Sequence, residues 1–242
     1  PDVHRSAAAL SVGIGHLSDP VEKQGLAHYL EHMLFLGTKK YPEIGSFKKY
    51  LDEHSGASNA YTGGAITNYF FQVSHKGFDK ALDRFSDFFK APLFDKTYAE
   101  REVKAVNNEH EKNKLRDGWR GGFVQHQVSE PSHPLTKFGT GNQETLSGSN
   151  RPALLGFYEK YYAASNMKLA LISNMPMQGL FNVAKLYFSD IPNRMVKTPV
   201  ISSEFRKPLK NHYRLLQIKT IKDIRTLEVD FPTIRLNAYQ AS

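Results

Sequence analysis

The most distinctive stretch of the sequence is Gly25-Leu26-Ala27-His28-Tyr29-Leu30-Glu31-His32-Met33-Leu34-Phe35-Leu36-Gly37. An α-helix turns about 100° per residue, so His28, Glu31 and His32 fall on one arc while almost every other position is apolar. A helix with this pattern is buried. Two imidazoles and a carboxylate are costly in an apolar setting unless a partner compensates them. The stretch therefore predicts a buried helix whose polar arc binds something.

A bound metal ion is the natural compensation, since two histidines four residues apart on a helix can reach one zinc. Glu31 lies beside them, and H-x-x-E-H is the inverted zinc signature. The alternative is a chance pair of core histidines that meets a glutamate. Because the chain contains no cysteine, a zinc site here would use nitrogen and oxygen ligands only.

A second stretch offers carboxylates that could complete such a site. Residues from Asp95 to about Trp119 predict one long charged helix. Glu102 and Glu109 lie two turns apart and share a face with Ala99 and Val106. Carboxylates on an apolar face need a cation, which is either a metal ion or a buried lysine or arginine. The helical period alone does not choose between Glu102 and Glu109.

The remaining pattern alternates strands with amphipathic helices. Ser18-Asp19-Pro20 predicts the start of the histidine-bearing helix, and Gly37 its end. Strands are predicted at residues 6–15, 57–62, 67–73 and 167–173, and helices at 45–54, 78–89, 154–162 and 177–188. Residues 138–142 predict a structural turn with two glycines. A linker from 191 to 208 precedes two further strands, at 212–219 and 224–231.

Composition narrows the class of protein. With 242 residues, 40% of them hydrophobic, the chain can bury the core of one large domain or of one domain and part of another. The net charge of +8 comes from scattered lysines and arginines, which disfavours a nucleic-acid-binding module. No apolar run approaches the roughly 18 residues of a membrane span. The N-terminus lacks the charged, apolar and small-residue regions of a signal peptide. A secreted protein whose signal peptide has been removed would look the same.

Four stretches of the chain resemble the insulysin/pitrilysin family of zinc metallopeptidases. They are residues 25–42, 58–62, 102–111 and 137–142. The resemblance implies an α+β fold, with a mainly antiparallel sheet packed on one side by helices, as in insulinase-like and processing-peptidase-like domains. It implies a catalytic domain over residues 1–205, and a linker with the truncated beginning of a related second domain over 206–242.

The resemblance also implies a role for each polar residue of the two helices. His28, His32 and Glu109 match the ligands of one Zn²⁺ per chain. Glu31 matches the catalytic base, and Glu102 matches an acidic residue that supports the ligands from behind.

Five further residues match positions that contact the substrate in the family. Asn59, Ala60 and Tyr61 match the strand to which the substrate is added as a β-strand. Phe35 and Trp119 match positions that line the pocket beside the scissile bond.

The implied function is zinc-dependent endopeptidase activity on peptides and small unfolded polypeptides, inside a chamber of two halves. The other half would be either the C-terminal half of the same full-length protein or a partner half. A homodimer is also possible. This fragment alone would be weakly active or inactive. No nucleic acid and no membrane is expected as a partner. The compartment would be the periplasm for a pitrilysin-like bacterial protein and the cytosol for an insulysin-like one. The alternative is a catalytically silent peptide-binding or scaffolding homologue of the processing-peptidase type.

Overall fold

The computed structural model describes residues 4–149, 151–201 and 215–229. The chain forms two compact units, residues 1–110 with 137–200 and residues 111–136 with 201–242. The boundary between them falls near the end of helix α4 (Lys96–Asn113). Among the described residues, no helix is both long and apolar enough to cross a membrane.

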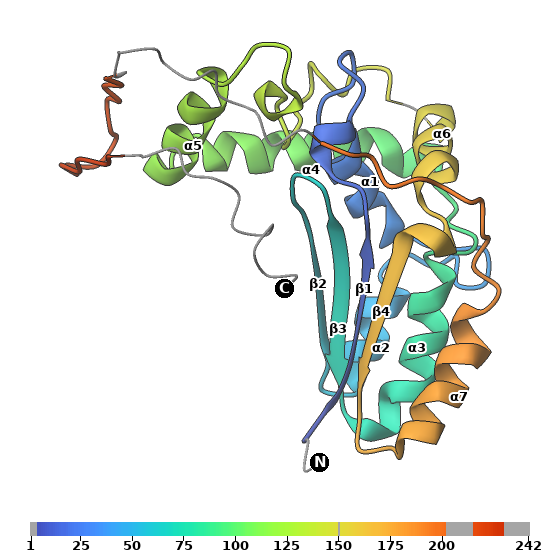
Figure 1. The fold of residues 1–242 in the computed structure, drawn as a ribbon. Helices are drawn as coiled ribbons and strands as arrows, with labels where there is room; N and C mark the ends of the chain where they lie inside the picture. Colours follow the sequence, from blue (N-terminus) through green and yellow to red (C-terminus); the bar gives the residue numbers. More distant parts are fainter. Residues whose placement is uncertain (1–3, 150, 202–214, 230–242) are drawn as a thin grey trace, which may run out of the picture. The chain divides into compact units, whose positions relative to one another are not determined.

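The first unit is built on one four-stranded antiparallel sheet (Figure 1). Its strands are β1 (Ser6–Val12), β2 (Ala57–Thr62), β3 (Thr67–Val73) and β4 (Met167–Ile172), in the order β2-β3-β1-β4. β2 and β3 form the predicted hairpin, which pairs Thr62 with Thr67 next to the turn. Central strand β1 pairs with both β3 and β4. Among the described residues β2 pairs with β3 alone, so β2 is an edge strand.

Helices cover one face of this sheet, as Figure 1 shows for α2 (Ser46–Glu53), α3 (Phe78–Asp87) and α7 (Met177–Phe188). In β3 the side chains of Tyr69 and Phe71 are fully buried, whereas Phe70 between them is exposed. Phe71 packs against Phe85 of α3 with ring centroids 5.1 Å apart. Burying one such ring contributes about 1.5–3 kcal/mol. The predicted α+β fold, with helices on one side of an antiparallel sheet, is confirmed.

Helix α1 (Leu26–Leu34) starts later than the proline at position 20 predicts. The carboxylate of Asp19 still caps the helix, because it accepts the backbone N–H groups of Gly25 at 2.7 Å and of Ala27 at 2.9 Å. The intervening residues form a turn, and Gly25 reverses the chain with a positive φ of 91°. The helix ends at Leu34, so Gly37 lies beyond its end instead of terminating it directly.

The long helix predicted from Asp95 to Trp119 is two helices. α4 ends at Asn113, and α5 (Asp117–Gln127) begins after Arg116, whose extended backbone (φ −109°, ψ 120°) interrupts the helical hydrogen bonds. At the start of α5, the Asp117 carboxylate accepts the backbone N–H groups of Ile221 at 2.7 Å and Lys222 at 3.1 Å, within the second unit. A contact between such distant segments does not show in a helical period.

Two predicted strands near the C-terminus are wrong where they can be checked. Residues 215–219 and 224–229 form no strand in the structure. Residues 212–214 and 230–231, which complete the two predictions, lie outside the described residues. Alternating apolar residues favour a strand only when a neighbouring edge is there to accept its hydrogen bonds.

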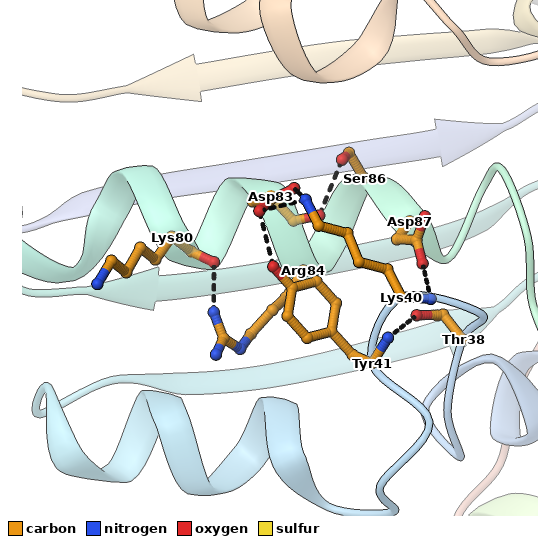
Figure 2. Close-up of polar contacts among 8 residues, drawn as sticks. All are labelled: Thr38, Lys40, Tyr41, Lys80, Asp83, Arg84, Ser86 and Asp87. Carbon is orange, nitrogen blue, oxygen red and sulfur yellow. Dashed lines mark hydrogen bonds and ion pairs between the residues drawn. The ribbon is translucent and has the colours of Figure 1, made fainter.

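Asp83 of α3 holds the loop that follows α1 (Figure 2). Lys40 Nζ donates to both of its carboxylate oxygens, at 2.6 and 2.7 Å, and the Tyr41 hydroxyl donates to Oδ2 at 2.7 Å. The Arg84 guanidinium lies 4.5 Å from the centroid of the Tyr41 ring, and the backbone N–H of Lys40 donates to Asp87. Burial alone would raise the pKa of Asp83, but the hydrogen bonds from Lys40 and Tyr41 together lower it.

We expect Asp83→Asn to lower the free energy of unfolding by about 1 kcal/mol at pH 7, because a neutral acceptor replaces a charged one. The pKa of Asp83 is lower in the folded chain, so this stabilisation is complete above the unfolded value of about 4 and is lost as pH falls through the folded pKa. Urea unfolding at pH 7 and pH 3 measures both effects. The control is Asp52→Asn, which removes the exposed Lys48–Asp52 pair and should cost less than about 0.5 kcal/mol. Equal losses at pH 7 would contradict the prediction.

Candidate metal centre

Helices α1 and α4 bring together three side chains that are distant in sequence. The Tyr29 hydroxyl of α1 donates to the backbone carbonyl of Ala99 in α4 at 2.8 Å, which fixes one helix against the other. With this packing, one potential ligand atom from each of His28, His32 and Glu109 lies within 4.8 Å of the others. Among the described residues, this is the group of three that could hold a metal ion.

The spacing of these atoms suits a small cation. Nε2 of His28 and Nε2 of His32 each lie 3.6 Å from Oε2 of Glu109. In a tetrahedral zinc site with bonds of about 2.0–2.2 Å, ligand atoms are about 3.4 Å apart. The imidazole rings stand edge to face, with an interplanar angle of 86°. Both imidazole–carboxylate separations are close to this value, and the three residues therefore fit a metal ion.

The second nitrogen of each imidazole is engaged on the side away from Glu109. His28 Nδ1 lies 2.8 Å from the carbonyl oxygen of Thr140, and His32 Nδ1 lies 3.4 Å from Oε2 of Glu102. A carbonyl oxygen can only accept, so Nδ1 of His28 carries a proton and the neutral ring has a free lone pair on Nε2. Partners of this kind orient metal-binding histidines.

The charge of the site also favours a cation. Burial alone would lower the pKa of His32, but hydrogen bonds to Glu102 and Glu109 raise it to about 9. The carboxylates of Glu102 and Glu109 thus concentrate negative charge around His32, and this charge favours the binding of a cation.

The apolar face predicted for α4 is present in the structure. Ala99 and Val106, which share that face with Glu102 and Glu109, are buried.

Glu31 lies on the same arc of α1 but is not one of the three convergent groups. It is 7% exposed, and its Oε2 accepts a hydrogen bond of 2.6 Å from the hydroxyl of Thr62. Burial raises the pKa of Glu31, and the hydrogen bond from Thr62 offsets part of that rise. A carboxylate with a raised pKa, beside a potential metal site, is suited to proton transfer.

The glycine-bearing turn at residues 138–142 has a role that the sequence reasoning missed. It supplies the Thr140 carbonyl that orients His28, and it lies against the start of α1. A Cβ on Gly25 would come within 2.2 Å of the Gly141 Cα, and one on Gly139 within 2.6 Å of the His16 ring. The glycines on both sides of Thr140 were the available signal, since close backbone approach requires glycine.

Three of the predicted substrate-binding residues lie on the edge strand. Asn59 and Tyr61 of β2 are exposed on the open face of the sheet, and Ala60 between them is half-buried. The Asn59 side-chain oxygen accepts the backbone N–H of Ala60 at 2.9 Å. The backbone N–H of Ala60 therefore has a side-chain partner, which a peptide pairing with this edge would have to displace.

The two predicted pocket residues lie in different units. Phe35, directly after α1, packs against Phe88 with ring centroids 5.4 Å apart and lines an open, largely apolar pocket of about 340 Å³ together with Asn59. Trp119 lies on α5 in the second unit and is half exposed. Its predicted place beside the scissile bond stays a prediction.

Comparison with known protein families gives two matches. Residues 1–132 match the family described as Insulinase (Peptidase family M16), and residues 149–233 match the Peptidase M16 inactive domain. The chain belongs to peptidase family M16. The predicted insulysin/pitrilysin resemblance is thereby confirmed.

Relatives of this M16 chain include two named proteases. It is 43% identical over 236 residues to the insulin-degrading enzyme of Homo sapiens, covering 94% of this chain and 23% of the relative. It is 40% identical over 221 residues to Protease 3 of Salmonella typhimurium, covering 88% of this chain and 23% of that one. The crystal structure of pitrilysin superposes with a TM-score of 0.82 at 42% identity, over 85% of this chain and 22% of that one. The chain thus spans about a quarter of the length of these relatives.

Proposed function

We propose that this chain carries the metal site and the general base of a zinc-dependent endopeptidase. The observation that carries the proposal is the convergence of His28, His32 and Glu109 beside a buried glutamate, Glu31, that is held apart from them. Relatives named insulin-degrading enzyme and Protease 3 support peptide hydrolysis as the reaction. The substrates would be peptides and small unfolded polypeptides.

His28, His32 and Glu109 would hold one Zn²⁺ per chain, since two imidazoles and a carboxylate form a usual catalytic zinc set. When bound, zinc supplies Lewis-acid chemistry, which makes a water molecule acidic near neutral pH and stabilises negative charge on a carbonyl oxygen. Glu102 and the Thr140 carbonyl would keep the two imidazoles in the orientation and tautomer that this set requires.

Glu31 acts as the general base in this proposal. Its carboxylate accepts the proton of the attacking water and later transfers that proton to the nitrogen of the leaving amine. Because the pKa of Glu31 is raised toward neutral pH, the carboxylate can both accept a proton and return it. The apolar surroundings on α1 limit the access of bulk water to the carboxylate.

The substrate would bind as an additional strand along β2. An extended peptide that pairs with a sheet edge is held mainly by backbone hydrogen bonds, which depend little on its sequence. Asn59, Ala60 and Tyr61 would form this edge, while Phe35 and Trp119 would contact side chains near the scissile bond. Such binding suits unfolded segments.

We also propose that this chain is one part of a larger chamber. The relatives are about four times as long as this chain, so a chamber would need further parts, either from the same protein or from a partner. We propose a catalytic domain over residues 1–205 and the beginning of a related domain over 206–242. This fragment alone would bind zinc and cleave peptides poorly.

Elemental analysis combined with a peptide digest tests the proposal. The full-length protein should contain one zinc per chain and should hydrolyse an unstructured peptide, and a chelator should abolish the hydrolysis. Absence of both zinc and hydrolysis would favour the alternative of a catalytically silent peptide-binding or scaffolding homologue. Rapid hydrolysis by this fragment alone would contradict the need for a chamber.

A further inference from the structure

The catalytic helix is joined to the edge strand by one short hydrogen bond. Thr62 Oγ1 donates to Glu31 Oε2 at 2.6 Å. O–H···O⁻ bonds of 2.5–2.7 Å are the strong, charge-assisted kind. Glu31 is almost fully buried, so few water molecules can compete with this donor. The bond is therefore well placed to fix the direction of the carboxylate.

The donor is held on a rigid element. Thr62 is the last residue of β2 and pairs directly with Thr67 of β3. The Thr67 hydroxyl donates to the carbonyl of Ile14 at 2.9 Å, which ties this end of the hairpin to the chain beyond β1. The alternation of β2 places Thr62 on the same, half-buried face as Ser58 and Ala60. The hydroxyl is thus presented to α1 by the backbone of the hairpin.

The hydrogen bond from Thr62 restricts rotation of the Glu31 carboxylate. Glu31 lies next to His32 and one helical turn from His28 on the same arc of α1. A carboxylate free to rotate could turn toward them and compete with Glu109. A donor on Oε2 opposes that rotation and leaves Oε1 to accept a proton.

We propose that Thr62 is a positioning residue, which holds the Glu31 carboxylate in place and couples the general base to the strand that receives the substrate. This inference rests on the proposed function. The peptide would pair with the backbone of β2, and the side chain at the end of that same strand sets the base. Placement of the substrate and of the base therefore depends on one rigid element. The Thr62 hydroxyl contributes to kcat and not to binding of the peptide.

Steady-state kinetics test the positioning role of Thr62. They compare variants of the full-length, zinc-loaded protein that lack or retain the hydroxyl. Thr62→Val removes the donor at nearly constant volume and should lower kcat by about 10- to 100-fold, with KM changed less than about 3-fold. Thr62→Ser keeps the donor and should retain kcat within about 3-fold. Both should keep one zinc per chain and bind a non-cleavable peptide as the parent does. If Thr62→Val does not fold, Thr62→Ala removes the same donor.

Thr67→Val is the matched control, because it removes a hydroxyl from the same hairpin that bonds to Ile14 and not to Glu31. It should lower stability with kcat within about 3-fold. Equal kcat in Thr62→Val and the parent, an effect of Thr62→Val on KM alone, or loss of zinc in Thr62→Val would each overturn the role of Thr62. Absence of hydrolysis in the parent protein would overturn the proposed function itself, and with it this inference.

Discussion

Replacing Glu31→Gln should leave zinc bound at one ion per chain and lower kcat by about 10²- to 10⁴-fold. Glutamine has nearly the same shape and can still accept the hydrogen bond from Thr62, but it cannot take a proton from water. The metal content should persist, because Glu31 is not among the three convergent groups. Steady-state kinetics on an unstructured peptide, with elemental analysis of the same preparation of full-length protein, measures both quantities.

Glu53→Gln is the control for this experiment, since Glu53 is an exposed residue at the end of α2. It should change neither zinc content nor kcat. Full activity in Glu31→Gln would exclude Glu31 as the base. Loss of zinc in that variant would instead make Glu31 a ligand.

Glu109→Gln should have the second large effect, a loss of zinc. Its Oε2 lies 3.6 Å from Nε2 of both histidines, so the substitution removes the negative charge at the centre of the group. The matched variant is Glu102→Gln on the same face of α4, which changes only the partner of His32 Nδ1. Loss of such an outer partner costs about 10- to 100-fold in metal affinity, and Glu109→Gln should cost more.

Competition with a zinc-binding dye measures the two affinities at fixed pH. A larger loss in Glu102→Gln than in Glu109→Gln would reverse the assignment of ligand and supporting residue. Circular dichroism checks that both variants are folded, which matters because α4 carries part of the core through Val106.

Much of the fold could be predicted because its strands and most of its helices have strong local patterns. β2 and β3 begin and end at the predicted residues, since a glycine turn precedes a stretch rich in aromatic and β-branched residues in β3. Helix α3 follows from its stripe of phenylalanines, which packs on the sheet. The predictions that failed concern residues whose conformation depends on distant segments. Arg116 interrupts a helix near Asp117, whose carboxylate binds the chain at Ile221.

In the candidate site, too, the features set by local pattern could be predicted and those set by distant segments could not. The amino-acid pattern alone predicts that His28, Glu31 and His32 share one arc of a buried helix, because that arrangement depends only on the helical period. It also placed Glu102 and Glu109 on the apolar face of a second helix, with no means in the period to rank them.

Which atoms come into contact depends on tertiary packing. The packing of α1 on α4 puts Glu109 opposite both Nε2 atoms and Glu102 beside Nδ1 of His32. It also brings the Thr140 carbonyl to His28 and the Thr62 hydroxyl to Glu31, from segments far apart in the chain. A local pattern sets the face on which a side chain lies. The atom that it contacts is set by how the elements pack, and that depends on the whole core.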